Sequence, residues 1–164
     1  MTDEAPARGR LFLITAPSEA RAAAVAGQLG DRLERAFVVS GSQIGAMVVQ
    51  GPGADAPSAL ERVRALLLRW SACLAAAETF LLEGYDAVVH DTILGEHLED
   101  FLDLCAPETV HVVVLDDAAA TGTPRWGLWL DPSLAADAVA DELLARLEES
   151  EVLTVEPTGA GDEA

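Results

Sequence analysis

Short apolar runs alternate with amphipathic stretches along most of the chain. The apolar runs have the length of strands, and the stretches between them repeat apolar residues every three or four positions, as helices do. The predicted strands are residues 10–15, 36–39, 86–91, 110–115 and 126–130, and the predicted helices are residues 19–35, 42–49, 58–83, 94–105 and one opened by Pro132. This alternation predicts an α/β fold with a parallel five-stranded sheet and helices on both faces.

The longest predicted helix, residues 58–83, is apolar over more than half of its circumference. Its main stripe consists of Leu60, Val63, Leu67, Trp70, Leu74, Ala77 and Leu81, and a second apolar set consists of Leu68, Ala72, Ala75 and Leu82. A helix of this kind needs two surfaces to pack against. We expect the sheet to cover the stripe and a protein partner to bind the second set. A hetero-complex is favoured, and a homodimer is the alternative.

Length and composition indicate one domain, since the chain has 164 residues. We expect residues 1–9 to be a flexible arm, residues 10–149 to form the domain, and residues 150–164 to be a disordered acidic tail. No apolar run approaches the roughly 20 residues of a membrane span, and residues 1–10 lack the apolar core of a signal peptide. A cytoplasmic protein is therefore expected.

The net charge is −18, from 28 acidic and 10 basic residues. Such a field repels nucleic acid and anionic lipid and opposes the entry of ATP, so none of the three is expected as a partner. The acidity has two interpretations: it keeps an alanine-rich protein soluble, or it forms a binding surface for a basic partner. Three histidines and two cysteines show no metal-ligand spacing, so no metal site is expected.

Residues 11–24 have the strand–loop–helix frame of a phosphate-binding P-loop without its chemistry. The pattern G-x-x-x-x-G-K-[ST] places its glycines on Ala16 and Arg21, its lysine on Ala22 and its hydroxyl on Ala23. The charge that reaches the phosphates and the hydroxyl that binds magnesium are both missing. Ser18 is a predicted N-cap, and the carboxylate of Glu19 then lies in the first helical turn, where a phosphate would otherwise bind. We expect no nucleotide and no cofactor.

Five segments in order carry a family resemblance: LFLITAPS, FVVSGSQI, FLLEGYDAVVHDTIL, VHVVVLDD and GLWLDPSLAADAVADELLARL. With them the chain, from about residue 10 to residue 149, resembles small-molecule P-loop kinases of the chloramphenicol phosphotransferase-like group. It differs from them by a degenerate Walker A loop and a truncated lid.

The resemblance implies several site positions. The acidic residues that follow the second strand in such kinases match Ser42 and Gln43, neither of which serves as a base at neutral pH. The lid matches residues 117–126, where few residues remain. Asp91 is the surviving acidic residue, and we expect Arg21 to approach it where magnesium would bridge. His90 and Asp91 are neighbours on one strand, so they point to opposite faces and do not form a pair.

The resulting hypothesis is a catalytically inactive P-loop kinase-like protein, not an enzyme, that acts as an accessory or stabilising subunit of a partner enzyme. Natural-product biosynthesis is the suggested setting, because the kinase group includes antibiotic-modifying enzymes. The alternative is a nucleotide-independent enzyme or a metabolite-binding regulator that uses the former substrate cleft around Ser40, Ser42, Gln43 and Asp91. An acid, a base and a nucleophile within mutual reach would favour the enzyme.

Overall fold

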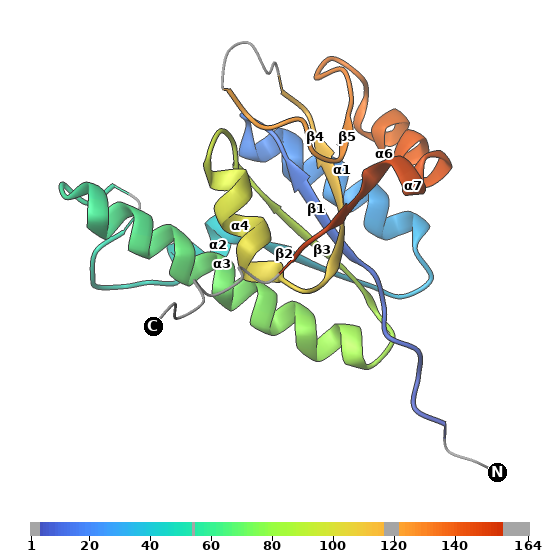
Figure 1. Ribbon diagram of the computed structural model, residues 1–164, viewed down its shortest axis with the longest axis horizontal. Helices are drawn as coiled ribbons and strands as arrows, with labels where there is room; N and C mark the ends of the chain where they lie inside the picture. Colours follow the sequence, from blue (N-terminus) through green and yellow to red (C-terminus); the bar gives the residue numbers. More distant parts are fainter. Residues whose placement is uncertain (1–3, 54, 117–121, 156–164) are drawn as a thin grey trace, which may run out of the picture.

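The computed structural model describes residues 4–53, 55–116 and 122–155 (Figure 1). Its strands are β1 (Leu11–Thr15), β2 (Ala36–Ser40), β3 (Asp86–Asp91), β4 (Thr109–Val114), β5 (Leu128–Trp129) and β6 (Glu151–Leu153). Its helices are α1 (Glu19–Arg32), α2 (Gly41–Ala46), α3 (Ala59–Leu82), α4 (His97–Cys105), α6 (Ala136–Ala145) and α7 (Leu147–Ser150).

The sheet confirms the predicted α/β architecture. Five parallel strands follow the order β2-β3-β1-β4-β5, and β6 adds an antiparallel partner to β4. The predicted disordered tail from residue 150 is wrong for the residues of β6. In this strand Val152 pairs with Val110 and packs, partly buried, against the core. The predicted arm is also attached at its end, because the Gly9 N–H donates to the Leu81 carbonyl at 3.0 Å. Residues 156–164 lie outside the described part.

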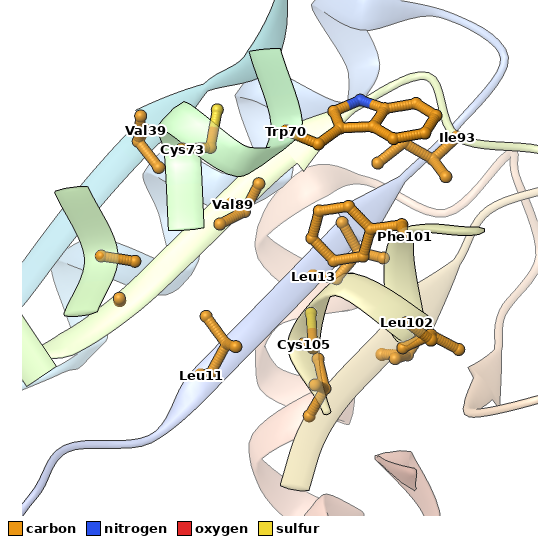
Figure 2. Close-up of a cluster of buried hydrophobic side chains, with 14 of the residues drawn as sticks. Leu11, Leu13, Val39, Trp70, Cys73, Val89, Ile93, Phe101, Leu102 and Cys105 are labelled. Atoms are coloured by element: carbon orange, nitrogen blue, oxygen red, sulfur yellow. The ribbon is translucent and has the colours of Figure 1, made fainter. Parts of the chain in front are cut away.

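Each face of the sheet carries its own apolar core, because successive strand residues point to opposite sides. Phe12 and Ile14 of β1 face α1 and α6, whereas Leu11 and Leu13 face α3 and α4. Figure 1 shows α1, α6 and α7 on one side of the sheet, with α3 and α4 on the other. On the second side Trp70 lies fully buried near Phe101 (Figure 2), with ring centroids 6.1 Å apart.

Helix α3 is only partly covered by the sheet. Trp70, Cys73, Ala77 and Leu81 are buried, but the first turns project beyond the body (Figure 1). The predicted inward stripe is therefore wrong at its start, where Leu60 is 57% exposed. By length and composition alone α3 could also cross a membrane, contrary to the expectation that no segment would reach that length. The core helix of a soluble protein passes the same test.

Candidate functional site

The carboxyl ends of β1, β2 and β3 meet at one edge of the sheet, which is where ligands bind in open α/β folds. Helix α1 starts shortly after β1, and α2 follows β2 directly. Two polar groups of residues lie at this edge, one on each face of the sheet. Glu19 and His90 lie on the α1 face, and Asp91 with Arg69 lies on the α3 face.

The degenerate P-loop positions form part of the apolar core. Ala16 and Ala22 are fully buried among the residues of β1 and α1, and Ala23 is partly buried. The predicted N-cap is confirmed, since the Ser18 hydroxyl accepts from the Arg21 N–H at 3.3 Å. The expected approach of Arg21 to Asp91 is wrong. Arg21 donates instead to the Leu134 carbonyl, because Asp91 points to the opposite face of the sheet.

Glu19 brings a carboxylate to the first turn of α1. Its Oε1 lies 2.9 Å from His90 Nδ1 and accepts a hydrogen bond from Ser40 Oγ at 3.3 Å. Its Oε2 is buried without a hydrogen-bond partner among the described residues. A phosphate at this helix N-terminus would meet a fixed negative charge.

Two serines extend these contacts toward α2. Ser40, which is buried, caps α2 by accepting from the Gln43 N–H at 3.2 Å. Its Oγ also lies 3.0 Å from Ser42 Oγ. The hydrogen-bond chain therefore runs from Ser42 through Ser40 to Oε1 of Glu19. His90 Nδ1 contacts the same carboxylate oxygen. Such a chain can pass a proton from a hydroxyl to a carboxylate.

Asp91 is enclosed on the α3 face and has a different environment. Its side chain is 1% exposed and accepts from Arg69 Nε at 3.0 Å, from Arg69 Nη2 at 2.9 Å and from Trp70 Nε1 at 2.9 Å. The Thr92 N–H is a fourth donor, at 2.9 Å. Burial raises the pKa of the nearby Cys73 thiol to about 11, and the Asp91 charge adds to this shift, so Cys73 supplies no thiolate.

Helix α2 packs on the Arg69–Asp91 pair through two glycines. A Cβ atom on Gly41 would lie 2.1 Å from Asp91 Oδ2. A Cβ atom on Gly45 would lie 3.3 Å from both Arg69 Cδ and Arg69 Nη1. Because these glycines are four residues apart, they share one face of α2, and that face must be free of side chains.

A cavity of about 610 Å³ opens between α2, residues 48–53 with Asp55, and α3. We call it the α2–α3 pocket. Its lining residues are Ser42, Ile44, Gly45, Ala46, Val48, Gln50, Gly51, Pro52, Gly53, Asp55, Ala65, Leu68, Arg69 and Ala72. The wall is mostly apolar, and Ser42 and Arg69 place a hydroxyl and a guanidinium on it.

The predicted cleft residues are only partly brought together. Ser42 lines the pocket, and Ser40 contacts Ser42 from a buried position. Asp91 is separated from the pocket by Arg69 and does not line it, and Gln43 is exposed and also outside the lining. The truncated-lid prediction falls largely on residues 117–121, which lie outside the described residues.

The predicted interface residues divide into two sets. Leu68 and Ala72 line the α2–α3 pocket, whereas Ala75 and Leu82 do not. Leu68 is 69% exposed and Leu82 is 57% exposed. Their binding of a partner remains a prediction.

Sequence reasoning did not identify Arg69 as a site residue. The signal was present, because Arg69 is the only charged residue between Arg64 and Glu78 in an otherwise apolar helix. A lone cation in such a segment usually has a buried partner. Within the described part of the chain, no group of three or more histidine, cysteine, aspartate or glutamate side chains could hold a metal ion.

No protein-family model and no curated protein matches this chain. Solved structures do match. An APS kinase of Mycobacterium tuberculosis is 21% identical and has a TM-score of 0.64, with 87% of this chain and 99% of that one covered. A tunicamycin resistance protein of Deinococcus radiodurans is 16% identical, with a TM-score of 0.55 and coverage of 92% and 99%. A gluconokinase of Sinorhizobium meliloti is 14% identical, with a TM-score of 0.52 and coverage of 87% and 93%.

These comparisons correct one expectation. The protein was expected not to be an enzyme, but the structures that share its fold include an APS kinase solved with AMPPNP and APS and a gluconokinase. The comparisons therefore overturn the expectation that the protein is not an enzyme, which no finding supports. At these identities the likeness shows the fold, and it confirms the P-loop kinase-like resemblance. The chain has the fold of the P-loop kinases.

Proposed function

We propose that this protein binds a small molecule in the α2–α3 pocket and acts on it without a nucleotide. The pocket has the size of a small-molecule site, since such sites commonly enclose about 300–1,000 Å³. It also lies beside the carboxyl ends of β2 and β3, at the functional edge of this kind of sheet.

Nucleotide independence is supported by the residues that replace the P-loop. Ala22 and Ala23 provide neither the cation nor the hydroxyl that triphosphate and magnesium require. Glu19 adds a carboxylate at the N-terminus of α1, held by Ser40 and His90. The kinase neighbours support the fold and an enzymatic role, and the chemistry at this loop differs from that of a P-loop.

The observation that carries the proposal is the placement of Ser42. Its hydroxyl lines the pocket and is hydrogen-bonded through Ser40 to the Glu19 carboxylate. A proton leaving a bound molecule can pass through the two hydroxyls to Glu19, which then acts as a base at a distance. This supports an enzyme that uses acid–base chemistry over a metabolite sensor.

A fluorescence titration tests the binding site. The probe is 6-propionyl-2-(dimethylamino)naphthalene, a neutral naphthyl ketone whose emission brightens and shifts to shorter wavelength in an apolar cavity. Saturable binding to the wild-type protein is expected. Ala72→Phe and Ala65→Phe, which fill the pocket, should abolish it.

The matched control is Ala75→Phe, which adds the same side chain to α3 at an exposed position outside the pocket. It should bind the probe as the wild type does. Equal binding by Ala72→Phe, Ala65→Phe and the wild type would contradict the assignment of the pocket.

Binding of a partner enzyme is a second candidate function, favoured by the uncovered side of α3. Ala75 is exposed and Leu82 is 57% exposed, and neither lines the pocket. Ala75 and Leu82 are seven residues apart and so share one face of α3, and a contiguous exposed apolar patch commonly marks an interface. The charge of −18 disfavours a second copy and favours a partner with a basic rim. The natural-product setting belongs to this candidate, since one neighbour is a tunicamycin resistance protein.

This second candidate is tested by the pair Ala75→Arg and Leu82→Asp, combined in one variant. A basic protein that co-purifies with the wild type from the native host, and binds it again when purified, should not bind the variant. The pocket probe should still bind the variant. A reconstituted complex that is unaffected by both substitutions excludes this face of α3.

A further inference from the structure

We infer that the ligand of the α2–α3 pocket is a neutral molecule with an apolar body and an oxygen acceptor, a carbonyl or hydroxyl, at one end. The inference rests on the proposed function and identifies the class of ligand. It follows from the hydrogen bonds of Arg69, whose side chain is 17% exposed and forms part of the pocket wall.

One nitrogen of Arg69 is left for a ligand. Nε and Nη2 donate to Asp91, and Nη1 donates no hydrogen bond to any residue that the structure describes. Nη1 lies beside Gly45, which also lines the pocket, and the absence of a Cβ atom there leaves the approach open. An arginine nitrogen donates and never accepts, so the ligand must present an acceptor.

Ser42 is a second polar group of the wall, and Gln50 and Asp55 also line it from the segment that follows α2. The Ser42 hydroxyl lies 3.0 Å from Ser40 Oγ and can donate to or accept from a ligand atom in addition. The rest of the wall near these two groups is apolar, including Ile44, Ala65 and Ala72. The pocket therefore combines a polar end with an apolar body, and the ligand should match both.

The charges around Arg69 oppose an anionic ligand. Asp91 already compensates the guanidinium inside the fold. A ligand carboxylate would leave a net negative charge beside Arg69, and the Glu19 carboxylate lies only two hydroxyls away through Ser40 and Ser42. Charges repel strongly where water is excluded. An ammonium group has no lone pair to accept a hydrogen bond from Arg69 Nη1, so the ligand group that meets this nitrogen is a neutral acceptor.

The test compares two fluorophores of one shape, the naphthyl ketone named above and 6-(dimethylamino)naphthalene-2-carboxylate. The wild-type protein should bind the ketone at least about tenfold more tightly than the carboxylate. Arg69→Met/Asp91→Asn removes the guanidinium together with its partner, so no buried charge is left alone. This variant should bind the ketone about tenfold more weakly, with emission shifted to shorter wavelength because the carbonyl loses its donor.

The outcomes separate this inference from the proposed function. Ser42→Ala should weaken ketone binding severalfold, and Ala75→Phe should leave both probes unchanged. Equal or tighter binding of the carboxylate, or unchanged ketone affinity and emission in Arg69→Met/Asp91→Asn, would overturn the inference while the pocket assignment stands. The absence of saturable binding of both probes to the wild type would overturn the proposed function and this inference with it.

Discussion

Glu19 and Asp91 are two carboxylates at one edge of the sheet, and their surroundings differ. Asp91 is 1% exposed with four hydrogen-bond donors, two of them from one guanidinium. Glu19 has a side chain that is 33% exposed, and one of its oxygens is buried without a partner among the described residues. Asp91 is therefore fixed by its donors, whereas Glu19 is the carboxylate that the proposed acid–base chemistry uses.

The Arg69–Asp91 pair should show strong energetic coupling. Arg69→Met or Asp91→Ala alone leaves an uncompensated charge in a buried position and should lower the free energy of unfolding by about 3–5 kcal/mol. The double variant should lose less than the sum of the two, because neither charge remains. Urea unfolding of the four proteins measures the coupling. Additive losses would show that the pair is solvated and contributes little.

Glu19 should contribute less to stability than Asp91. Glu19→Ala removes the acceptor for Ser40 and the contact with His90, at a cost of about 1–2 kcal/mol in the free energy of unfolding. The matched control is Glu61→Ala, which removes an exposed carboxylate from the first turn of α3 and should change stability by less than about 0.5 kcal/mol. Urea unfolding measures both variants. Equal losses in the free energy of unfolding would show that Glu19 acts only through the helix dipole and that its contacts with Ser40 and His90 contribute nothing.

At the scale of elements, α2 depends on glycine for its position. Gly41→Ala should cost about 1–3 kcal/mol, because the added methyl group would overlap Asp91 and must displace it. Gly27→Ala serves as the matched control in α1, where nothing lies within 4 Å of an added Cβ atom. It should stabilise the protein by about 0.5–1 kcal/mol. Thermal unfolding of both variants checks the prediction, and a stabilising Gly41→Ala would contradict the packing of α2 on the ion pair.

The sequence predicted those elements whose burial follows a regular period. Strands β1, β3 and β4 are fully or almost fully buried, so they appear in the sequence as apolar runs, whereas β2 is only partly buried. Helix α1 shows a clear helical period. Strand β6 was not predicted, because only Val152 of its three residues packs against the core. The exposure of the first turns of α3 was not predicted either, since hydrophobic periodicity does not show where the sheet beneath a helix ends.

The candidate site was less predictable than the fold, because its contacts join residues far apart in the sequence. Glu19 was placed correctly at the start of α1 from the capping pattern of Ser18. The partner of Asp91 was predicted wrongly, since only Arg21 was considered and Arg69 was not. The direction of the Asp91 side chain, toward α3, decides between them.

At the scale of the whole molecule, the chain has the fold of kinases but carries different residues at the phosphate loop. The net charge of −18 repels nucleotides in general, and the Glu19 carboxylate repels them locally at the start of α1. A pocket lies between α2 and α3, on the face of the sheet opposite to Glu19. These features together support our proposal that the protein acts on a small molecule without a nucleotide.

Isothermal titration of magnesium-ATP into the wild-type protein tests whether the protein works without a nucleotide. We predict no saturable heat up to millimolar nucleotide, since Ala22 and Ala23 replace the groups that hold triphosphate and magnesium, and Glu19 places a negative charge at the start of α1. Magnesium-dependent binding in the micromolar range would contradict this proposal and place the protein with the nucleotide-binding kinases.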